Sequence, residues 1–143
     1  MKVLKFGGTS VANSKSLNKV LEIIKNQNDS IVVVVSALAG ITDLLMEMLS
    51  LAESRKDNFK SNLSKIEKLH LEPIKKCIPI QNQSAIISYL KKHLNELESR
   101  LDAIFLLEEV TKKNNASVAS YGEILSSNII HEIFNHNKID SEL

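Results

Sequence analysis

Two short apolar runs near the N-terminus, with an amphipathic stretch between them, predict a β–α–β unit. Residues Val3 to Phe6 are typical of a short strand, and the unbroken β-branched run from Ile31 to Val35 is typical of a strand buried on both faces of a parallel sheet. Either Ser14 or Ser16 is the expected N-cap of the intervening helix. The apolar residues of that helix recur at i, i+3, i+4 and i+7: Leu17, Val20, Leu21 and Ile24.

The pattern from residue 44 to residue 112 is mostly helical. One helix is expected over Leu44 to Ala52, and a second runs from Phe59 past His70 and ends near Pro73. A loop is expected from Cys77 to Gln83, and a third helix follows it. Its apolar seam alternates spacings of three and four: Ile87, Leu90, Leu94, Leu97, Leu101 and Ile104. We interpret residues 44–112 as a helical insertion that forms a hairpin or small bundle, with the seam packed inside the chain rather than between chains.

The C-terminal part predicts one more helix. The polar run from Lys112 to Asn115 is interpreted as a turn, and the helix is expected from about Val118 to Asn135. Lys138 and Ile139 are compatible with the start of a further strand. The predicted fold class is therefore α/β, with a parallel β–α–β start and a long, mainly helical insertion.

The composition is that of an ordinary globular protein. The chain has 143 residues, of which 43% are hydrophobic and 24% are charged, with a net charge of +1. The near-neutral charge gives no reason to expect nucleic acid or an anionic membrane as a partner. The N-terminus lacks the apolar region of a secretory signal, and the single cysteine, Cys77, excludes an internal disulfide. We expect a soluble cytoplasmic protein whose thiol is inert.

The four glycines fall in three short segments that also carry candidate ligand-binding side chains. The first is Lys5-Phe6-Gly7-Gly8-Thr9-Ser10, at the end of the first strand. Glycines placed there let backbone N–H groups turn toward a phosphate, and the lysine and hydroxyls add a cation and donors. Because the segment matches neither the Walker A pattern nor GxGxxG, a phosphate site and an ordinary strand-ending turn both remain open.

The second segment, from Val34 to Asp43, leaves the second strand at its carboxyl end, where open α/β sheets bind their ligands. Ser36 and Thr42 supply hydroxyl groups on either side of a bend of small residues. Thr42 or Asp43 is alternatively the N-cap of the following helix, which we favour for Asp43.

The third segment, from Ser120 to Ser127, contains Gly122 and Glu123. We place Gly122 in the first turn of the final helix, where glycine costs about 1 kcal/mol relative to alanine and is explained if something packs closely against it. Glu123 is suited to receive the ammonium group of a ligand. An acidic residue in a first helical turn is also stabilised by the macrodipole, so both explanations stand.

Other patterns do not form sites. The run from His131 to Asn135 begins like HExxH but lacks the second histidine. His70 and His93 are isolated and are expected on a helix surface or interface. We predict no metal site and no catalytic triad.

Taken together, the three segments resemble the aspartate kinase family, within the amino-acid kinase superfamily. The stretches Lys5–Val11, Val34–Asp43 and Ser120–Ser126 are similar to three signature blocks of that family, in the same order, over residues 2 to about 130. The long helical segment resembles the larger members, including the bifunctional aspartokinase–homoserine dehydrogenases. Ile124 departs from the pattern, since the family commonly has arginine after that glutamate.

The resemblance implies transfer of a phosphoryl group from ATP, bound with Mg²⁺, to the side chain of L-aspartate. This reaction gives 4-phospho-L-aspartate and begins lysine, threonine and methionine biosynthesis. Lys5 is the implied catalytic residue. The implied phosphate contacts are Lys5, Gly7, Gly8, Thr9 and Ser10. The implied L-aspartate contacts are Ser36, Thr42 and Glu123, with Glu123 facing the α-ammonium.

The resemblance also implies that residues 1–143 are the N-terminal, substrate- and phosphate-binding part of a kinase domain. In the family the nucleotide-binding half and ACT regulatory domains follow, so these residues alone are expected to be inactive or nearly so. The full-length protein is expected to be a homo-oligomer. Two alternatives remain: an amino-acid kinase that phosphorylates another acid, such as an acylated glutamate, and a non-catalytic binding or assembly module built on the helices.

Overall fold

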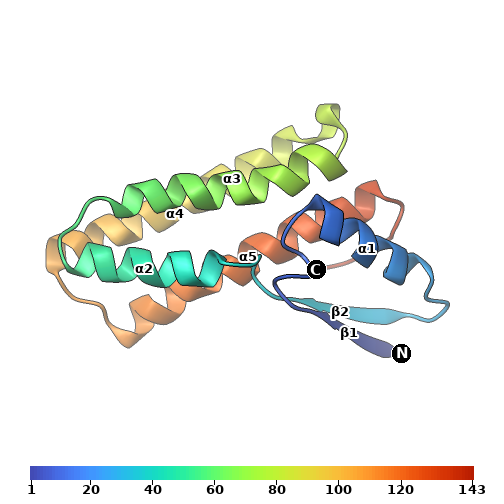
Figure 1. The fold of residues 1–143 in the computed structure, drawn as a ribbon, viewed down its shortest axis with the longest axis horizontal. Coiled ribbons are helices and arrows are strands. Elements are labelled where there is room, and N and C mark those ends of the chain that lie inside the picture. Colours follow the sequence, from blue (N-terminus) through green and yellow to red (C-terminus); the bar gives the residue numbers. More distant parts are fainter.

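The computed structural model describes residues 1–143 and places a two-stranded parallel sheet at one end of a helical bundle (Figure 1). Strand β1 (Lys2–Phe6) pairs with β2 (Ile31–Val35), and the register runs from Lys2 opposite Ile31 to Phe6 opposite Val35. Helix α1 (Ser14–Lys25) connects the two strands. The predicted β–α–β unit is therefore confirmed.

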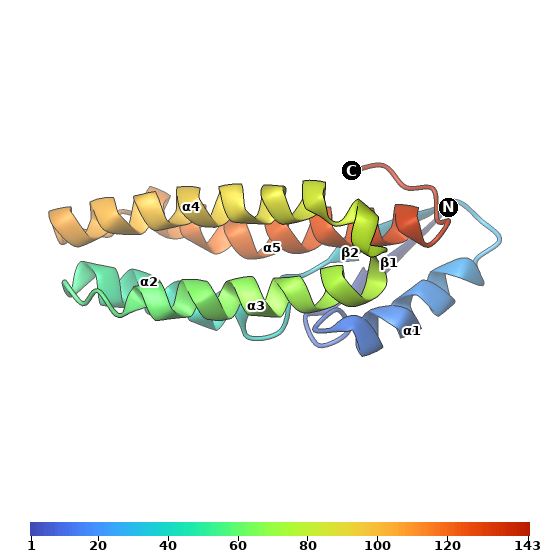
Figure 2. The ribbon, with the colours of Figure 1, turned by 90° about the horizontal axis from the view of Figure 1, so that it is seen from above.

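Four long helices form the bundle, and a 3₁₀ turn, η1 (Ile80–Asn82), links the second of them to the third. The four are α2 (Ile41–Glu53), α3 (Phe59–Cys77), α4 (Ser84–Leu107) and α5 (Lys112–His136). Figure 2 shows two layers, with α2 and α3 in one and α4 and α5 in the other. None of these helices combines the length and the apolar character that a membrane span requires. The predicted α/β class with a mainly helical middle is confirmed.

One hydrophobic core of 30 buried residues extends through both parts of the molecule. Leu17 of α1, Leu97 of α4 and Leu125 of α5 are all fully or almost fully buried in it. The predicted seam of α4 faces this core, except that Ile86 is buried where Ile87 was expected and Ile87 is half-buried. The seam thus packs inside the chain, as predicted.

The N-terminus of α1 differs from the prediction. Asn13 is the N-cap, and its side-chain oxygen accepts a hydrogen bond from the Ser16 N–H at 3.0 Å. Ser14 is the first helical residue, and its hydroxyl donates to Glu72 of α3 instead of capping. A tertiary contact therefore decides which of several suitable residues caps the helix.

Helix α3 continues through Pro73 to Cys77, beyond its predicted end. Proline lacks the N–H that the helix would use and costs about 3 kcal/mol or more in a helix interior. Pro73 and Ile74 are both buried, and the packing of this face offsets that cost. The predicted loop from Cys77 is accordingly shorter and contains η1.

Helix α5 begins at Lys112, earlier than predicted, because the Thr111 hydroxyl accepts a hydrogen bond from the Asn114 N–H at 3.1 Å. The polar run expected to be a turn is therefore the first turn of this helix. Gly122 and Glu123 consequently lie in the middle of α5. The macrodipole, which acts within the first turn, does not explain Glu123.

Neither Thr42 nor Asp43 caps α2. The N-cap is Gly40, whose φ of 81° lies in the left-handed region that glycine adopts readily, and no side chain bonds to this helix end. Thr42 and Asp43 are exposed in the first turn. The segment after α5 forms no strand at Lys138 and Ile139.

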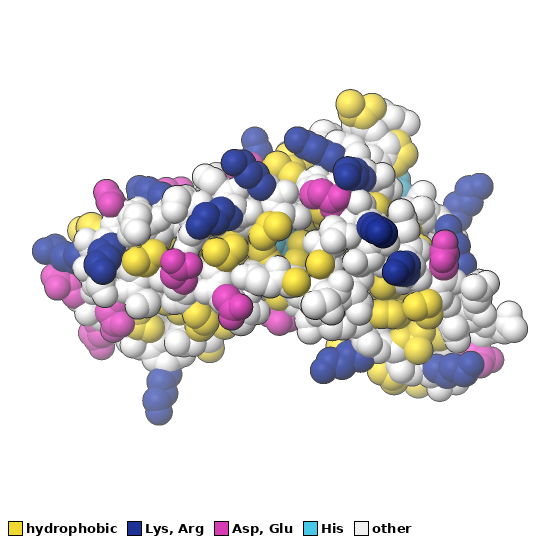
Figure 3. Space-filling model, viewed as in Figure 1, with side chains coloured by type: hydrophobic (Ala, Val, Ile, Leu, Met, Phe, Trp, Pro, Cys, Tyr) yellow, Lys and Arg dark blue, Asp and Glu magenta, His cyan; other side chains and the backbone are white.

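The chain covers only one face of the sheet. Val32 and Val34 are 45% and 42% exposed, whereas Ile31, Val33 and Val35 on the opposite face are half-buried. The prediction that this strand is buried on both faces is wrong for residues 1–143. In Figure 3 hydrophobic side chains gather over the strands at the lower right, while charges of both signs are scattered over the bundle.

Candidate functional site

The three glycine-containing segments meet where the carboxyl ends of β1 and β2 reach the middle of α5. The Ala39 N–H donates to the Gly8 carbonyl at 3.2 Å, and the Ser36 N–H donates to the Phe6 carbonyl at 3.2 Å. These two bonds join the first segment to the second through the backbone. Since β1 and β2 are parallel, both loops leave the sheet at the same edge.

Gly8 and Gly122 permit this close approach. A Cβ on Gly8 would lie 2.8 Å from the Ala37 carbonyl oxygen, and a Cβ on Gly122 would lie 2.7 Å from the Ala37 Cβ. Neither distance is available to a real side chain without displacement of the neighbour. The prediction that close packing explains Gly122 is confirmed.

One turn of α5 holds the end of β2. Ser126 is fully buried, and its hydroxyl donates to the Ser36 carbonyl at 2.8 Å. The Glu123 Oε1 accepts a hydrogen bond from the Ala37 N–H at a longer 3.4 Å. Glu123 is exposed and takes part in none of the six salt bridges of the structure. Its negative charge is therefore available to a ligand at this junction.

Lys5 and Thr42 lie at the edge of the junction. Lys5 is exposed on β1 opposite Val34 and has no ion-pair partner in the chain. Thr42 is exposed next to Ile41, whose Cγ2 would lie 3.6 Å from a Cβ on Gly122. The structure thus places Lys5 one residue before the end of β1 and Thr42 in the first turn of α2, with no hydrogen bond or ion pair to Glu123.

The glycine loop, residues 7–13, is a tight turn followed by a buried anchor. The Ser10 N–H donates to the Gly7 carbonyl at 2.9 Å, and Val11 is fully buried. A Cβ on Gly7 would meet nothing within 4 Å, so there is open space beside this part of the backbone. The N–H groups of Gly7, Gly8 and Thr9 donate to no acceptor within the protein. Thr9 is exposed and Ser10 is half-buried.

Two of the titratable groups with shifted pKa values, His70 and Cys77, lie on α3, outside the three glycine-containing segments. His70 is completely buried between the helices, and burial lowers its pKa to about 4 although a hydrogen bond to the Ile66 carbonyl opposes the shift. That carbonyl, 2.8 Å from Nδ1, can only accept, so Nδ1 carries the proton and Nε2 is left without a partner. Burial and the nearby Glu72 charge raise the pKa of the Cys77 thiol. No group of three His, Cys, Asp or Glu side chains is arranged to hold a metal ion.

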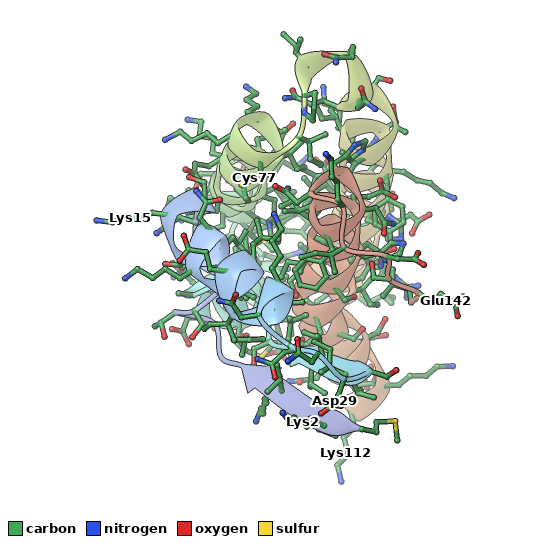
Figure 4. All side chains as sticks on the ribbon, turned by 90° about the vertical axis from the view of Figure 1, so that its right-hand side faces the viewer. Lys2, Lys15, Asp29, Cys77, Lys112 and Glu142 are labelled. Atoms are coloured by element: carbon green, nitrogen blue, oxygen red, sulfur yellow. The ribbon has the colours of Figure 1, made fainter.

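Figure 4 views the molecule from the sheet end and labels Lys2 and Asp29, which form an ion pair of 3.6 Å at the end of the strands opposite the junction. Lys2 is therefore engaged with the protein, in contrast to Lys5 on the same strand. The difference marks Lys5 as the cation that β1 offers to a ligand.

Two residues without a predicted role shape this region. Ser126 lies three residues after Glu123 on the same face of α5, and that spacing is a signal that would have pointed to it. Glu72 contacts Ser14 across 58 positions of sequence, and no local pattern indicates such a pairing.

These features define an α/β domain with an anion-compatible glycine loop at its sheet edge and an unpaired carboxylate facing the same edge. Residues 1–143 match the model of the amino acid kinase family over their whole length, and the chain belongs to that family.

Within the family the chain is similar to aspartokinases. It is 35% identical over 128 residues to the aspartokinase of Chlamydia trachomatis, a match that covers 90% of this chain and 26% of that protein. It is 30% identical over 129 residues to the bifunctional aspartokinase/homoserine dehydrogenase 2, chloroplastic, of Arabidopsis thaliana, which covers 90% of this chain and 14% of that protein.

The fold agrees with the sequence matches. The structure of E. coli aspartokinase III in complex with aspartate and ADP (R-state) superposes with a TM-score of 0.86 at 25% identity, covering 99% of this chain and 30% of that one. The chain therefore spans less than a third of the length of these relatives. The resemblance to the aspartate kinase family seen in the sequence is confirmed.

Proposed function

We propose that the protein containing this chain is an ATP-dependent aspartate kinase, in which residues 1–143 are the N-terminal, phosphate- and substrate-binding part of the catalytic domain. The observation that carries the proposal is the junction itself, where the glycine loop, the end of β2 and Glu123 converge. The similarity to aspartokinases supports it, including a solved relative that contains aspartate and ADP.

The glycine loop is the proposed contact for the transferring phosphates of MgATP, which enters as substrate with its magnesium ion. Three successive backbone N–H groups of this loop have no acceptor in the protein, and the space beside Gly7 is open. Backbone N–H groups of this kind form anion-binding concavities. Lys5 adds a positive charge, and Thr9 and Ser10 add hydroxyl donors.

The opposite side of the junction is the proposed contact for L-aspartate. The exposed carboxylate of Glu123 pairs with the α-ammonium, since a charge-assisted hydrogen bond of this kind is stronger than a neutral one. Ser36 and Thr42 hydrogen-bond the substrate from the end of β2 and the start of α2. This division leaves the side-chain carboxylate of the substrate directed toward the glycine loop.

In the proposed reaction, a β-carboxylate oxygen of L-aspartate attacks the γ-phosphorus of ATP in line. A new P–O bond forms as the bond to the β,γ-bridging oxygen breaks, so that the products are ADP and 4-phospho-L-aspartate. Such a transfer depends on positioning and on neutralising the charge of the equatorial oxygens, and no covalent intermediate with the protein is required. Lys5 supplies a fixed cation where that charge develops.

The remaining proposals concern the whole protein. We propose that a nucleotide-binding half and ACT regulatory domains complete the enzyme, and that residues 44–112 are a helical insertion in its first half. We further propose a cytoplasmic homo-oligomer that catalyses the first step of lysine, threonine and methionine biosynthesis. The match to a bifunctional relative favours a parent fused to homoserine dehydrogenase.

The test is ADP formation by the full-length protein with L-aspartate as acceptor, compared with N-acetyl-L-glutamate. We expect turnover with L-aspartate and capture of the acyl phosphate as a hydroxamate by hydroxylamine. Residues 1–143 alone, under the same conditions, are expected to show no turnover.

A preference for N-acetyl-L-glutamate would assign the protein to another branch of the amino acid kinase family. Absence of turnover with either acid, together with a mass that rises with concentration, would favour the assembly module instead.

A further inference from the structure

The contact between α3 and the end of the glycine loop is built from two short hydrogen bonds. The Ser14 N–H donates to Glu72 Oε2 at 2.8 Å, and the Ser14 hydroxyl donates to Glu72 Oε1 at 2.6 Å. Ser14 is only 9% exposed. A single carboxylate therefore holds the first residue of α1 at two points.

This contact is one of three that fix the glycine loop. The Gly8 carbonyl is held near the start of the loop by the Ala39 N–H, at 3.2 Å, and Val11 is buried in its middle. Glu72 holds Ser14, immediately after the loop ends. Unbonded N–H groups lie along the whole loop, at residues 7–9 and 11–13, so their direction depends on both ends being fixed.

Glu72 also occupies one of the donors that the N-terminus of α1 would offer to an anion. A helix N-terminus offers four free N–H groups, which in α1 are those of Asn13, Ser14, Lys15 and Ser16. The Ser14 N–H is bonded to Glu72, and the Ser16 N–H is bonded to the Asn13 side chain. The N–H groups of Asn13 and Lys15 are left without an acceptor in the protein. The carboxylate thus removes one helix-end donor, whereas the N–H groups of Gly7, Gly8 and Thr9 all stay available to a phosphate.

The charge of Glu72 is balanced within its own helix. Lys76 lies one turn later on α3, with its Nζ 3.3 Å from Glu72 Oε1. Burial raises the pKa of the Glu72 carboxyl, but the hydrogen bonds from Ser14 and the Lys76 ammonium outweigh burial and hold the pKa below its ordinary value. The carboxylate is therefore ionised at neutral pH, and Lys76 reduces its repulsion of a nearby phosphate.

We propose that Glu72 is a positioning residue, which clamps Ser14 and thereby holds the glycine loop in the geometry that receives the transferring phosphate. The contact itself is independent of the proposed function, whereas its catalytic consequence rests on that function.

The test compares Glu72→Ala, Glu72→Gln and Ser14→Ala in the full-length protein. Glu67→Ala is the matched control, because it removes the same charge from α3 at a side chain with no hydrogen bond or salt bridge in the structure. Two readouts are needed: amide hydrogen exchange over residues 7–17, and steady-state kinetics with MgATP and L-aspartate varied separately. Thermal unfolding of each variant verifies that it is folded.

We expect Glu72→Ala and Ser14→Ala to accelerate amide exchange over residues 7–17 by about tenfold or more, because each variant loses at least one hydrogen bond that holds the loop. We expect kcat/KM for MgATP to fall roughly 10- to 100-fold, as for a small misplacement of reacting groups, with KM for L-aspartate within about twofold of wild type. Glu72→Gln keeps one acceptor oxygen, so its exchange rate and its kcat/KM for MgATP should lie between those of wild type and Glu72→Ala. Glu67→Ala should match wild type in both readouts.

Unchanged exchange in Glu72→Ala overturns the clamp, whatever the activity. Faster exchange with unchanged MgATP kinetics overturns the positioning role. A wild-type protein without kinase turnover contradicts the proposed function instead, and in that case hydrogen exchange still decides whether the clamp exists.

Discussion

The strand–loop region and the helical bundle use polar side chains in opposite ways. In the strand–loop region Lys5 and Thr9 are exposed and have no partners within the chain. In the bundle His70 and Asn62 are buried, and each leaves one polar atom unpaired inside the core. The first region presents groups to a ligand at little cost in stability, whereas the second carries most of the buried surface.

The two regions depend on each other at two contacts. Gly122 of α5 packs against Ala37 after β2, and Glu72 of α3 bonds to Ser14 at the start of α1. Long helices thereby hold short loops at both ends of the candidate site. Chemistry and rigidity are therefore separable in this molecule, and three substitutions test that separation.

The largest expected effect is on chemistry alone. Because Lys5 is exposed and unpaired, Lys5→Ala should leave the free energy of unfolding within about 0.5 kcal/mol of wild type. Loss of a fixed cation at the transferring phosphate should lower kcat in the full-length protein by roughly two to three orders of magnitude. Steady-state kinetics and urea unfolding measure the two quantities.

The matched control is Lys2→Ala on the same strand. Lys2 is paired with Asp29 at 3.6 Å, with both side chains more than half exposed, so little change is expected in either quantity. An unchanged kcat in Lys5→Ala would remove Lys5 from the mechanism.

The second effect is on stability alone and depends on pH. The folded-state pKa of His70, about 4, lies below the ordinary value of 6.5, so the unfolded chain binds a proton that the folded chain does not. Because of this residue, the free energy of unfolding should fall by about 3 kcal/mol as the pH drops from 6.5 to 4. Below pH 4 this residue should cause no further loss.

Urea unfolding of wild type and His70→Leu at several pH values measures this loss. The variant should lack this component of the pH dependence, so the difference in the free energy of unfolding between the two proteins should change by about 3 kcal/mol between pH 6.5 and pH 4. Parallel curves would show that His70 is not buried as a neutral side chain.

The smallest expected effect is on the stability of the contact that joins the two regions. Gly122→Ala adds a methyl group 2.7 Å from the Ala37 Cβ, and overpacking of this kind typically costs about 1–3 kcal/mol. The higher helix propensity of alanine offsets about 1 kcal/mol of this cost, so the free energy of unfolding is expected to fall by up to about 2 kcal/mol. The double substitution Ala37→Gly, Gly122→Ala removes the clash and should recover stability relative to Gly122→Ala. A single variant more stable than wild type would contradict the close packing of α5 on the end of β2.

Much of the fold is predictable from local patterns. The β-branched run of β2 and the alternating seam of α4 each fix an element by periodicity, and both elements lie where the pattern indicates. Element ends are less predictable because they depend on contacts distant in sequence. The buried face of α3 carries this helix past Pro73, and the Thr111 cap starts α5 several residues before its apolar pattern begins.

The candidate site shows the same division. Its first two segments are visible in the sequence because glycines and hydroxyl residues follow predicted strands, and the third is visible because a glycine interrupts a predicted helix. Their joining through Ala37 and Ser126 is not visible, because it requires α5 to cross the end of β2. No local sequence pattern predicts the contact of Glu72, since its partner Ser14 is 58 positions away.

The most direct test of the central claim is the L-aspartate dependence of Glu123→Gln in the full-length protein. The amide keeps an acceptor for the Ala37 N–H but removes the charge that would pair with the substrate ammonium. A charge-assisted hydrogen bond contributes about 1.5–3 kcal/mol, so KM for L-aspartate should rise tenfold or more while KM for MgATP stays within about twofold. Equal L-aspartate KM values in the two proteins would contradict the assignment of this junction as the amino-acid site.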